Sequence, residues 1–168
     1  RIFQTASRTF TSTALKYSGI LVSTSGFNQT VTGNTIGFGA ANGTGITAIS
    51  GSTNLFVGLD FTTGNTAAAT SVQGNVISGI SQDTASTGTG SGSAFRGIFL
   101  AGGRYDVGTI TGNQIGSLDG SSTITFIESS TGAFAAIYDF TSSSNPISNN
   151  RIGAITITGI GTGTGGFR

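Results

Sequence analysis

Apolar and polar positions alternate along this chain in short stretches that recur at a fixed interval. In each stretch an aromatic residue is followed by Gly or Ala two positions later and then by Ile or Leu. The four copies are Tyr17–Val22, Phe56–Phe61, Phe95–Leu100 and Phe134–Asp139, and each leading aromatic follows the previous one by 39 residues. Alternation with a period of two is typical of β-strands, and self-similarity at this longer period indicates stacked repeats.

Two columns of apolar residues are expected to face the core from these strands. They are Ile20, Leu59, Ile98 and Ile137, and, two positions further on, Val22, Phe61 and Leu100. Strict alternation then places Phe95 and Phe99 on the opposite face from Ile98. In the fourth copy Asp139 stands where the second column requires an apolar residue, and a one-residue shift is expected to bring Phe140 into its place.

A second phrase alternates with the first and follows the pattern [Val/Ile]-x-[Gly/Asn]-Asn-x-Ile-[Gly/Ser]. Its copies are Val31–Gly37, Val72–Ser78, Ile110–Gly116 and Ile147–Gly153. The two apolar residues of each copy are five positions apart, which breaks strand alternation. A bend at the Gly-Asn pair would turn both apolar residues inward, because Gly and Asn tolerate the left-handed backbone that a sharp bend needs. Steps of 41, 38 and 37 residues between the asparagines indicate connections of variable length.

These two phrases predict an all-β parallel β-helix of about four rungs that start near residues 17, 56, 95 and 134. Each rung supplies a strand, a connection, a second strand, the bend and a third strand, followed by a loop such as 38–44, 83–93 or 159–166. With 29 glycines and no helical stripe, long helices are excluded. A right-handed coil is expected from the strong bias of parallel crossovers. Residues 1–168 form a single segment.

The two phrases resemble the right-handed parallel β-helix repeats of secreted bacterial proteins, the pectin-lyase-like superfamily in the broad sense. The resemblance covers residues 14–168 and is carried by the Gly-Ile-x-[Leu/Val] strands and the Asn-x-Ile turns. It implies that the bend asparagines form an internal hydrogen-bonded ladder, namely Asn34, Asn75, Asn113 and Asn150. Because the family includes polysaccharide lyases and hydrolases, phage tailspikes and surface adhesins, the resemblance leaves the function open.

The composition limits the kinds of partner, metal and cofactor that can be expected. Charged residues make up 8% of the chain and the net charge is +1, which gives no reason to expect a nucleic-acid partner. The chain has no Cys and no His, so neither disulfides nor a zinc site is expected, and no metal or cofactor is predicted. No apolar run is long enough for a membrane span. These features fit an extracellular or cell-surface protein of bacterial origin.

The chain ends on Phe167 and Arg168, which copy Phe95 and Arg96, so a fifth rung is expected to follow. The sequence is therefore interpreted as a window of a longer array. The expected partners are neighbouring rungs of a longer chain, copies of the same chain, or surface glycans.

Six carboxylates are available for catalysis, and Asp60 is the best candidate because alternation places it on the outside of its strand. Arg96 on the next rung is the accompanying base candidate, although both residues are expected to be surface groups. Arg104 and Asp106 in a tight turn are a weaker pair. Phe99 and Tyr138 are candidates for carbohydrate binding because they adjoin in one column. The alternatives are that a loop or a neighbouring molecule covers these two rings or that they belong to the core.

Three further signals are weak. Thr30-Val31-Thr32 and Thr109-Ile110-Thr111 resemble the hydroxyl ranks of ice-binding faces, but the intervening rungs break the array. Asn28 and Asn42 begin glycosylation sequons. Asp83-Thr84-Ala85 resembles a short bacterial O-glycosylation signal.

A structural role is therefore expected, as a stalk, adhesin or fibre-forming surface segment without catalysis of its own. The alternative is a carbohydrate-active β-helix, either a polysaccharide lyase or hydrolase or a sugar-binding module, that uses Asp60, Arg96 and the aromatic column.

Overall fold

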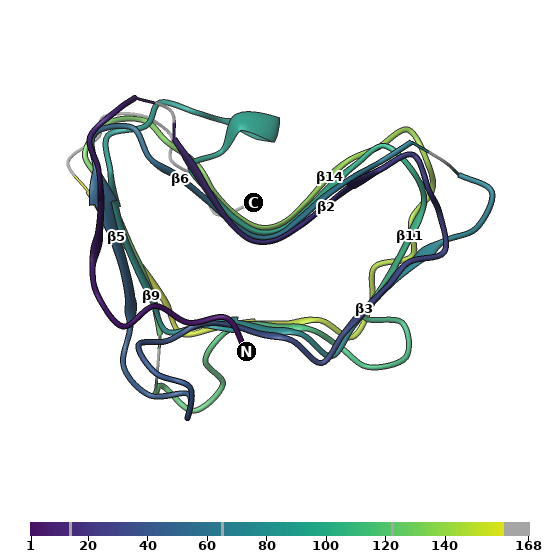
Figure 1. Cartoon of the computed structure of the whole chain (residues 1–168), viewed down its shortest axis with the longest axis horizontal. Helices are drawn as coiled ribbons and strands as arrows, with labels where there is room; N and C mark the ends of the chain where they lie inside the picture. Colours follow the sequence, from purple (N-terminus) through teal and green to yellow (C-terminus); the bar gives the residue numbers. More distant parts are fainter. Residues whose placement is uncertain (14, 65, 122, 160–168) are drawn as a thin grey trace.

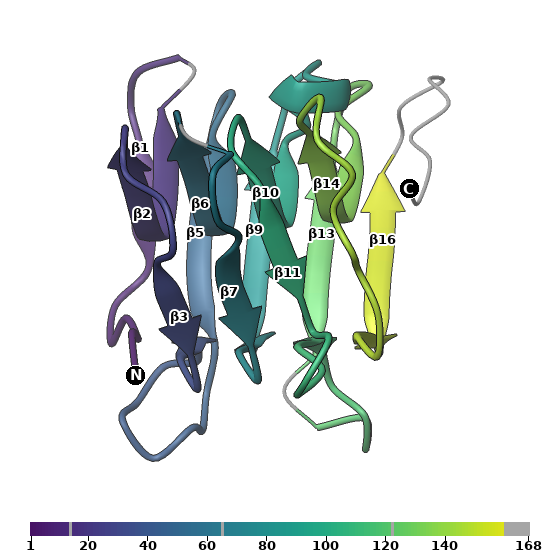
Figure 2. The same cartoon turned by 90° about the vertical axis from the view of Figure 1, so that its right-hand side faces the viewer.

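The chain coils into a parallel β-solenoid of about four turns (Figure 1). The computed structural model describes residues 1–13, 15–64, 66–121 and 123–159. Strands from successive turns lie side by side along the stack (Figure 2), and all the strand pairs within the described residues are parallel. The stacked parallel architecture predicted from the 39-residue period is confirmed, and the right-handed sense stays a prediction.

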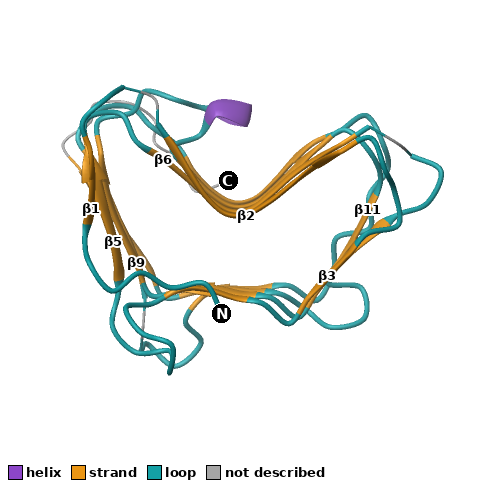
Figure 3. Ribbon diagram, viewed as in Figure 1, coloured by secondary structure: helices purple, strands orange, loops and turns teal. Residues whose placement is uncertain are grey.

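Four sheets run along the stack, and each turn contributes one strand to most of them (Figure 3). The aromatic sheet consists of β2 (Lys16–Thr24), β6 (Leu55–Thr63), β10 (Phe95–Ala101) and β14 (Phe134–Phe140). The short sheet consists of β3 (Thr30–Thr32), β7 (Thr70–Gln73) and β11 (Tyr105–Val107). The turn sheet consists of β4 (Thr35–Gly37), β8 (Val76–Ser78), β12 (Gln114–Gly116) and β15 (Arg151–Gly153).

The fourth sheet was not predicted from the sequence. It consists of β1 (Arg8–Phe10), β5 (Thr47–Gly51), β9 (Ile80–Thr84), β13 (Ile124–Glu128) and β16 (Ile155–Gly159). A rung therefore has four strands rather than three, and the loop expected to begin at Asp83 begins after Thr84. That loop carries the 3-10 turn η1 (Gly90–Gly92). Of the other two expected loops, 38–44 lies between β4 and β5, whereas most of 159–166 lies outside the described residues.

The aromatic phrase keeps the predicted 39-residue register. Phe95 pairs with Phe56 on one side and with Phe134 on the other. The rings of Phe56 and Phe95 stack with their centroids 4.9 Å apart, and those of Phe95 and Phe134 at 4.4 Å. Tyr17 extends the column, with its ring centroid 5.6 Å from that of Phe56. Because offset-stacked aromatic pairs add to the free energy of burial, this column is a main source of core stability.

The aromatic sheet bends at a column of small residues, Gly19, Gly58, Gly97 and Ala136. A Cβ atom placed on Gly58 would lie 2.6 Å from the carbonyl oxygen of Gly97 on the next rung, so the bend brings backbones closer than other residues allow. Figure 1 shows the resulting sheet, concave toward the outside. The bend resets the alternation of side chains. The expectation that Phe95 and Ile98 face opposite sides is therefore wrong, because both are fully buried in the core.

The bends of the second phrase lie between the short sheet and the turn sheet. Gly33, Gly74 and Asn149 adopt φ angles of 65°, 60° and 58°, the left-handed backbone for which Gly and Asn are suited. Ile36 and Ile77, which follow the bend, are fully buried.

In the third copy of this phrase the inward residue was predicted wrongly. Ile110 is 84% exposed, and Val107, in register with Val72, fills the core instead. The reason is an extra loop between Val107 and the bend. The Gln73 side chain fastens this loop, since its Oε1 accepts hydrogen bonds from the backbone N–H groups of Ile110 and Thr111 at 3.1 and 3.2 Å.

The shift expected in the fourth aromatic phrase is also absent. Asp139 stays in register with Leu100, and Phe140, which was expected to replace it, is 60% exposed. The carboxylate is satisfied locally, because Oδ1 accepts a hydrogen bond from the Thr141 N–H and Oδ2 accepts one from Asn145 Nδ2. A polar residue can therefore occupy this position without a change of register.

Candidate functional site

The four residues selected for catalysis or sugar binding lie together on the outer, concave side of the aromatic sheet. Asp60, Phe99 and Tyr138 occupy one column on three successive rungs. Arg96 reaches the same side because the bend at Gly97 reverses the alternation between it and Phe99. Alternation along the sequence did not predict that all four share one face, and their role in catalysis or sugar binding stays a prediction. We call this set, with Lys16 and Ser18 from the first rung, the outer-face cluster.

Asp60 is almost fully buried and its carboxylate is engaged by the first rung. Its Oδ2 accepts hydrogen bonds from Lys16 Nζ at 2.6 Å and from Ser18 Oγ at 2.8 Å, while its side chain is 1% exposed. Such charge-assisted hydrogen bonds are stronger than those between neutral groups, and Lys16 supplies the opposite charge. Asp60 was expected to be a solvated or paired surface group on the outside of its strand. It is paired and lies on the outer side, but it is buried.

Arg96 is covered as well. Its side chain is 5% exposed, its guanidinium carbon lies 4.5 Å from the centroid of the Phe99 ring, and its Nη1 donates a hydrogen bond to the carbonyl oxygen of Ser91. Burial lowers the pKa of Arg96, and the negative charge of Asp60 opposes this effect. A guanidinium in this setting remains a cation and an unsuitable general base.

The aromatic pair on this face is partly covered by the loop between β9 and β10. The Phe99 and Tyr138 rings stack with their centroids 6.2 Å apart and their planes 23° apart. Phe99 is only 9% exposed, whereas Tyr138 is half-buried. Figure 3 shows η1 on the outer side of the bent sheet, and a Cβ atom on Gly90 would lie 3.1 Å from the Tyr138 hydroxyl. Of the alternatives, coverage by a loop therefore describes these rings best.

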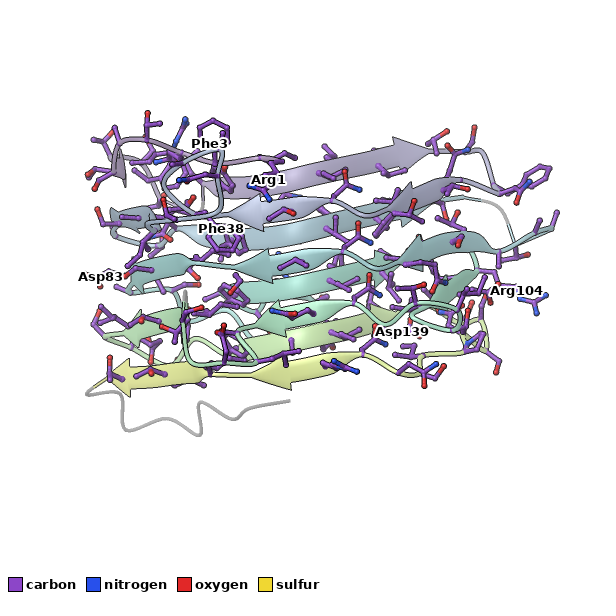
Figure 4. The ribbon with its side chains drawn as sticks, turned by 90° about the horizontal axis from the view of Figure 1, so that it is seen from below. Arg1, Phe3, Phe38, Asp83, Arg104 and Asp139 are labelled. Carbon is purple, nitrogen blue, oxygen red and sulfur yellow. The ribbon has the colours of Figure 1, made fainter. Side chains whose placement is uncertain are left out.

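The other carboxylates are dispersed. In Figure 4, Asp83 lies at the left end of the view and Asp139 lies in its right half, while Arg104 projects away from the stack at the right end. Within the described residues, no three His, Cys, Asp or Glu side chains are placed to hold a metal ion. Asp119 belongs to a local turn, in which hydrogen bonds from Ser117 and Ser121 lower its pKa to about 2. Among the described residues, the printed contacts of the Asp60 carboxylate are with Lys16 and Ser18 and not with another acid.

The bend asparagines form a continuous hydrogen-bonded column inside the corner between the short sheet and the turn sheet. Asn34 Nδ2 donates to Asn75 Oδ1 at 3.0 Å, Asn75 Nδ2 to Asn113 Oδ1 at 2.9 Å, and Asn113 Nδ2 to Asn150 Oδ1 at 2.8 Å. Each receiving Oδ1 also accepts the backbone N–H of the preceding asparagine at 3.0 Å. Asn75 and Asn113 are fully buried. Their side chains thus serve the scaffold and are not available to a ligand.

Replacing Asn113 by alanine should lower the free energy of unfolding by about 3 kcal/mol. The substitution removes both bonds donated by its Nδ2, to Val72 O and Asn150 Oδ1, and leaves the Asn75 backbone N–H without its acceptor. An unsatisfied buried polar group costs about 1–3 kcal/mol, and here more than one is created. Chemical denaturation followed by circular dichroism measures the change.

Asn42→Ala provides the matched control. Asn42 is exposed, and its Oδ1 accepts bonds from the N–H and hydroxyl of Thr44 within its own loop. Its replacement should change the free energy of unfolding by less than about 0.5 kcal/mol. Equal effects of the two substitutions would contradict the burial of the asparagine column.

The three glycosylation signals differ in accessibility. Thr84 is 1% exposed and its hydroxyl donates to the backbone oxygen of Asn54, so the Asp83-Thr84-Ala85 acceptor is buried in the folded chain. Asn28 and Asn42 are exposed. The folded chain therefore leaves the two sequons, but not the threonine, open to an enzyme.

The fold and the outer-face cluster define this chain as a parallel β-solenoid whose cluster of Asp60, Arg96 and Phe99 is covered. Comparison of the chain with protein-family models, with curated proteins and with solved structures found no match. None of the helical residues that the structure describes forms a helix long and apolar enough to cross a membrane.

Proposed function

We propose that this chain is a structural segment of an extracellular repeat protein, serving as a stalk, an adhesin or a fibre-forming part of a bacterial surface. The observation that carries the proposal is the continuity of the scaffold columns. The aromatic column runs through all four rungs from Tyr17 to Phe134, and the asparagine column from Asn34 to Asn150, with a bonded or stacked neighbour at each step.

In continuous columns of this kind, each rung makes the same contacts with the next rung. In such stacks, stability comes from nearest-neighbour contacts between repeats, which suits an extended and stiff element. The engaged state of Asp60 and the covered state of Arg96 also support a role without catalysis. A kinship with the pectin-lyase-like superfamily is part of the proposal and rests on the phrases in the sequence.

The surface location is tested with antibodies raised against the folded chain. Intact cells of the source organism should bind the antibody as strongly as permeabilised cells do. Binding that appears after permeabilisation alone would contradict an extracellular role. An antibody against a cytoplasmic protein serves as the control for membrane integrity.

The carbohydrate-active alternative is tested by incubation with acidic polysaccharides and calcium. Lyase products carry an unsaturated bond that absorbs ultraviolet light, and neither the wild-type chain nor the Asp60→Asn variant should produce them. A reducing-sugar assay on the same mixtures tests for hydrolysis. Turnover by the wild-type chain that Asp60→Asn abolishes would overturn the structural role in favour of an enzyme.

A further inference from the structure

Arg96 carries a buried charge that the described protein does not neutralise by a direct ion pair. No carboxylate of a described residue lies within 4.0 Å of its guanidinium, because the nearby Asp60 is bonded to Lys16 and Ser18 instead. A buried cation is normally paired, because its desolvation is costly. The outer-face cluster therefore contains one positive charge in excess, two cations against one carboxylate.

The hydrogen bonds of Arg96 are also incomplete. Its Nε is buried without an acceptor, and the acceptor of its Nη1 is a neutral backbone carbonyl, that of Ser91. Most buried donors in folded proteins have a partner, so an orphaned donor on a buried cation points to an acceptor that the chain itself does not supply. The guanidinium is held in place by the Phe99 ring beneath it.

The geometry of the orphaned donor and the charge of the cluster select the missing acceptor. Adjacent N–H groups of a guanidinium form a planar fork that matches the two oxygens of a carboxylate. The excess charge of the cluster is a single positive one, and the negative charge of Asp60 acts on Arg96. A monoanion such as a carboxylate neutralises the cluster, whereas a dianion such as phosphate would leave it with a net negative charge.

Access to Arg96 depends on the loop that carries η1. The loop is fastened to the next rung by the Ala133 N–H, which donates to the carbonyl oxygen of Gly88 at 2.9 Å. Beyond this anchor, the loop contacts the cluster through the Ser91 carbonyl, which accepts from Arg96 Nη1. The fork that includes the orphaned Nε is completed by Nη2, so a carboxylate bound there leaves the Ser91 carbonyl in place and lies close to the Gly90–Gly92 backbone.

We propose that Arg96, beneath the η1 loop, is a binding site for one carboxylate group of a small ligand, with the half-buried Tyr138 ring beside it. Two sources of this group are a simple organic acid and an acidic sugar whose ring contacts Tyr138. The site is independent of the structural role proposed above, since a surface stalk and an intracellular protein could both carry it.

Proton–nitrogen NMR of the labelled wild-type chain tests the site directly. Addition of glucuronate or acetate should move the Arg96 Nε–H resonance in a saturable manner, together with the amide resonances of Gly90–Gly92. The Nε–H of Arg104, an exposed arginine outside the cluster, is the internal control and should not move. Tighter binding of glucuronate than of acetate identifies a sugar acid, and equal binding identifies the carboxylate alone as sufficient.

Other outcomes of this titration would overturn the proposal. They are the absence of a saturable shift with both carboxylates, an equal response to glucose, and tighter binding of inorganic phosphate than of glucuronate. Arg96→Lys keeps the charge but loses the fork, so the affinity for glucuronate should fall by at least roughly tenfold. Arg104→Lys is the matched variant and should bind as the wild type does. Circular dichroism checks that both variants fold. If Arg96→Lys does not fold, the titration of the wild-type chain still tests the proposal.

Discussion

Replacing Phe95 by alanine is expected to remove about 3–5 kcal/mol from the free energy of unfolding, the usual cost of deleting a buried aromatic ring. Phe95 is fully buried at the centre of the aromatic column, and its ring stacks on Phe56 and Phe134 at 4.9 and 4.4 Å. Its loss opens a cavity, breaks both stacked contacts and removes the edge contact to Phe126. Because a domain has about 5–15 kcal/mol of stability in total, the variant should be largely unfolded in mild denaturant. Denaturant titration followed by circular dichroism measures the effect.

Two substitutions calibrate this result. Phe140→Ala removes the same side chain at a position that is 60% exposed, and should cost less than about 0.5 kcal/mol. Tyr17→Ala removes a half-buried ring with a single stacked neighbour, Phe56, and should lie between the two. If Phe95→Ala cost no more than Phe140→Ala, the aromatic column could not be the continuous core element that the register indicates.

The regular part of this fold could be predicted because it repeats. Strict spacing of the leading aromatics determines the register of the aromatic sheet, so the pairing of Phe56, Phe95 and Phe134 follows from counting. The fourth sheet was missed because only part of its pattern repeats: Ile80, Ile124 and Ile155 share one column, whereas the next column that faces the core is mixed. Ile49, Gln82 and Phe126 pair with one another in register, although one is polar. Gln82 is tolerated there because Nε2 donates to Asn54 Oδ1 at 2.9 Å.

Four members of the outer-face cluster were selected from the sequence, but neither their shared face nor Lys16 and Ser18 was predicted. Alternation alone assigns Arg96 and Phe99 to opposite faces, and the bend at Gly97 brings them to the same face. The signal for the bend was present, since a small residue recurs one position before Ile20, Leu59 and Ile98. The partner of Asp60 could not be found in this way, because Lys16 pairs with it across the bend from outside the phrase. Nor could the η1 loop be placed, because its Gly, Ser and Thr residues carry no periodic pattern.

Gly58→Ala is expected to destabilise the chain by about 3 kcal/mol, the upper end of the usual cost of overpacking. The added methyl group would lie 2.6 Å from the Gly97 carbonyl oxygen and 2.8 Å from Ile77 Cδ1. The φ angle of Gly58 is not in the left-handed region, so the cost arises from contact between rungs and not from the backbone itself. To relieve these close contacts, the second and third rungs must separate at the bend, where Asp60 and Arg96 come together. Thermal and denaturant unfolding measure the loss.

Gly92→Ala is the matched control, because the same methyl group would meet no atom within 4 Å and the backbone φ is again ordinary. Its effect should be neutral or stabilising by up to about 1 kcal/mol, since alanine restricts the unfolded chain. Ala136→Gly makes the opposite change in the same column of small residues. It removes a methyl group from the last rung of the bend and should cost about 0.5–1 kcal/mol. A neutral Gly58→Ala would mean that the rungs can separate freely at the bend, and the close stacking on which a stiff surface segment depends would then be wrong.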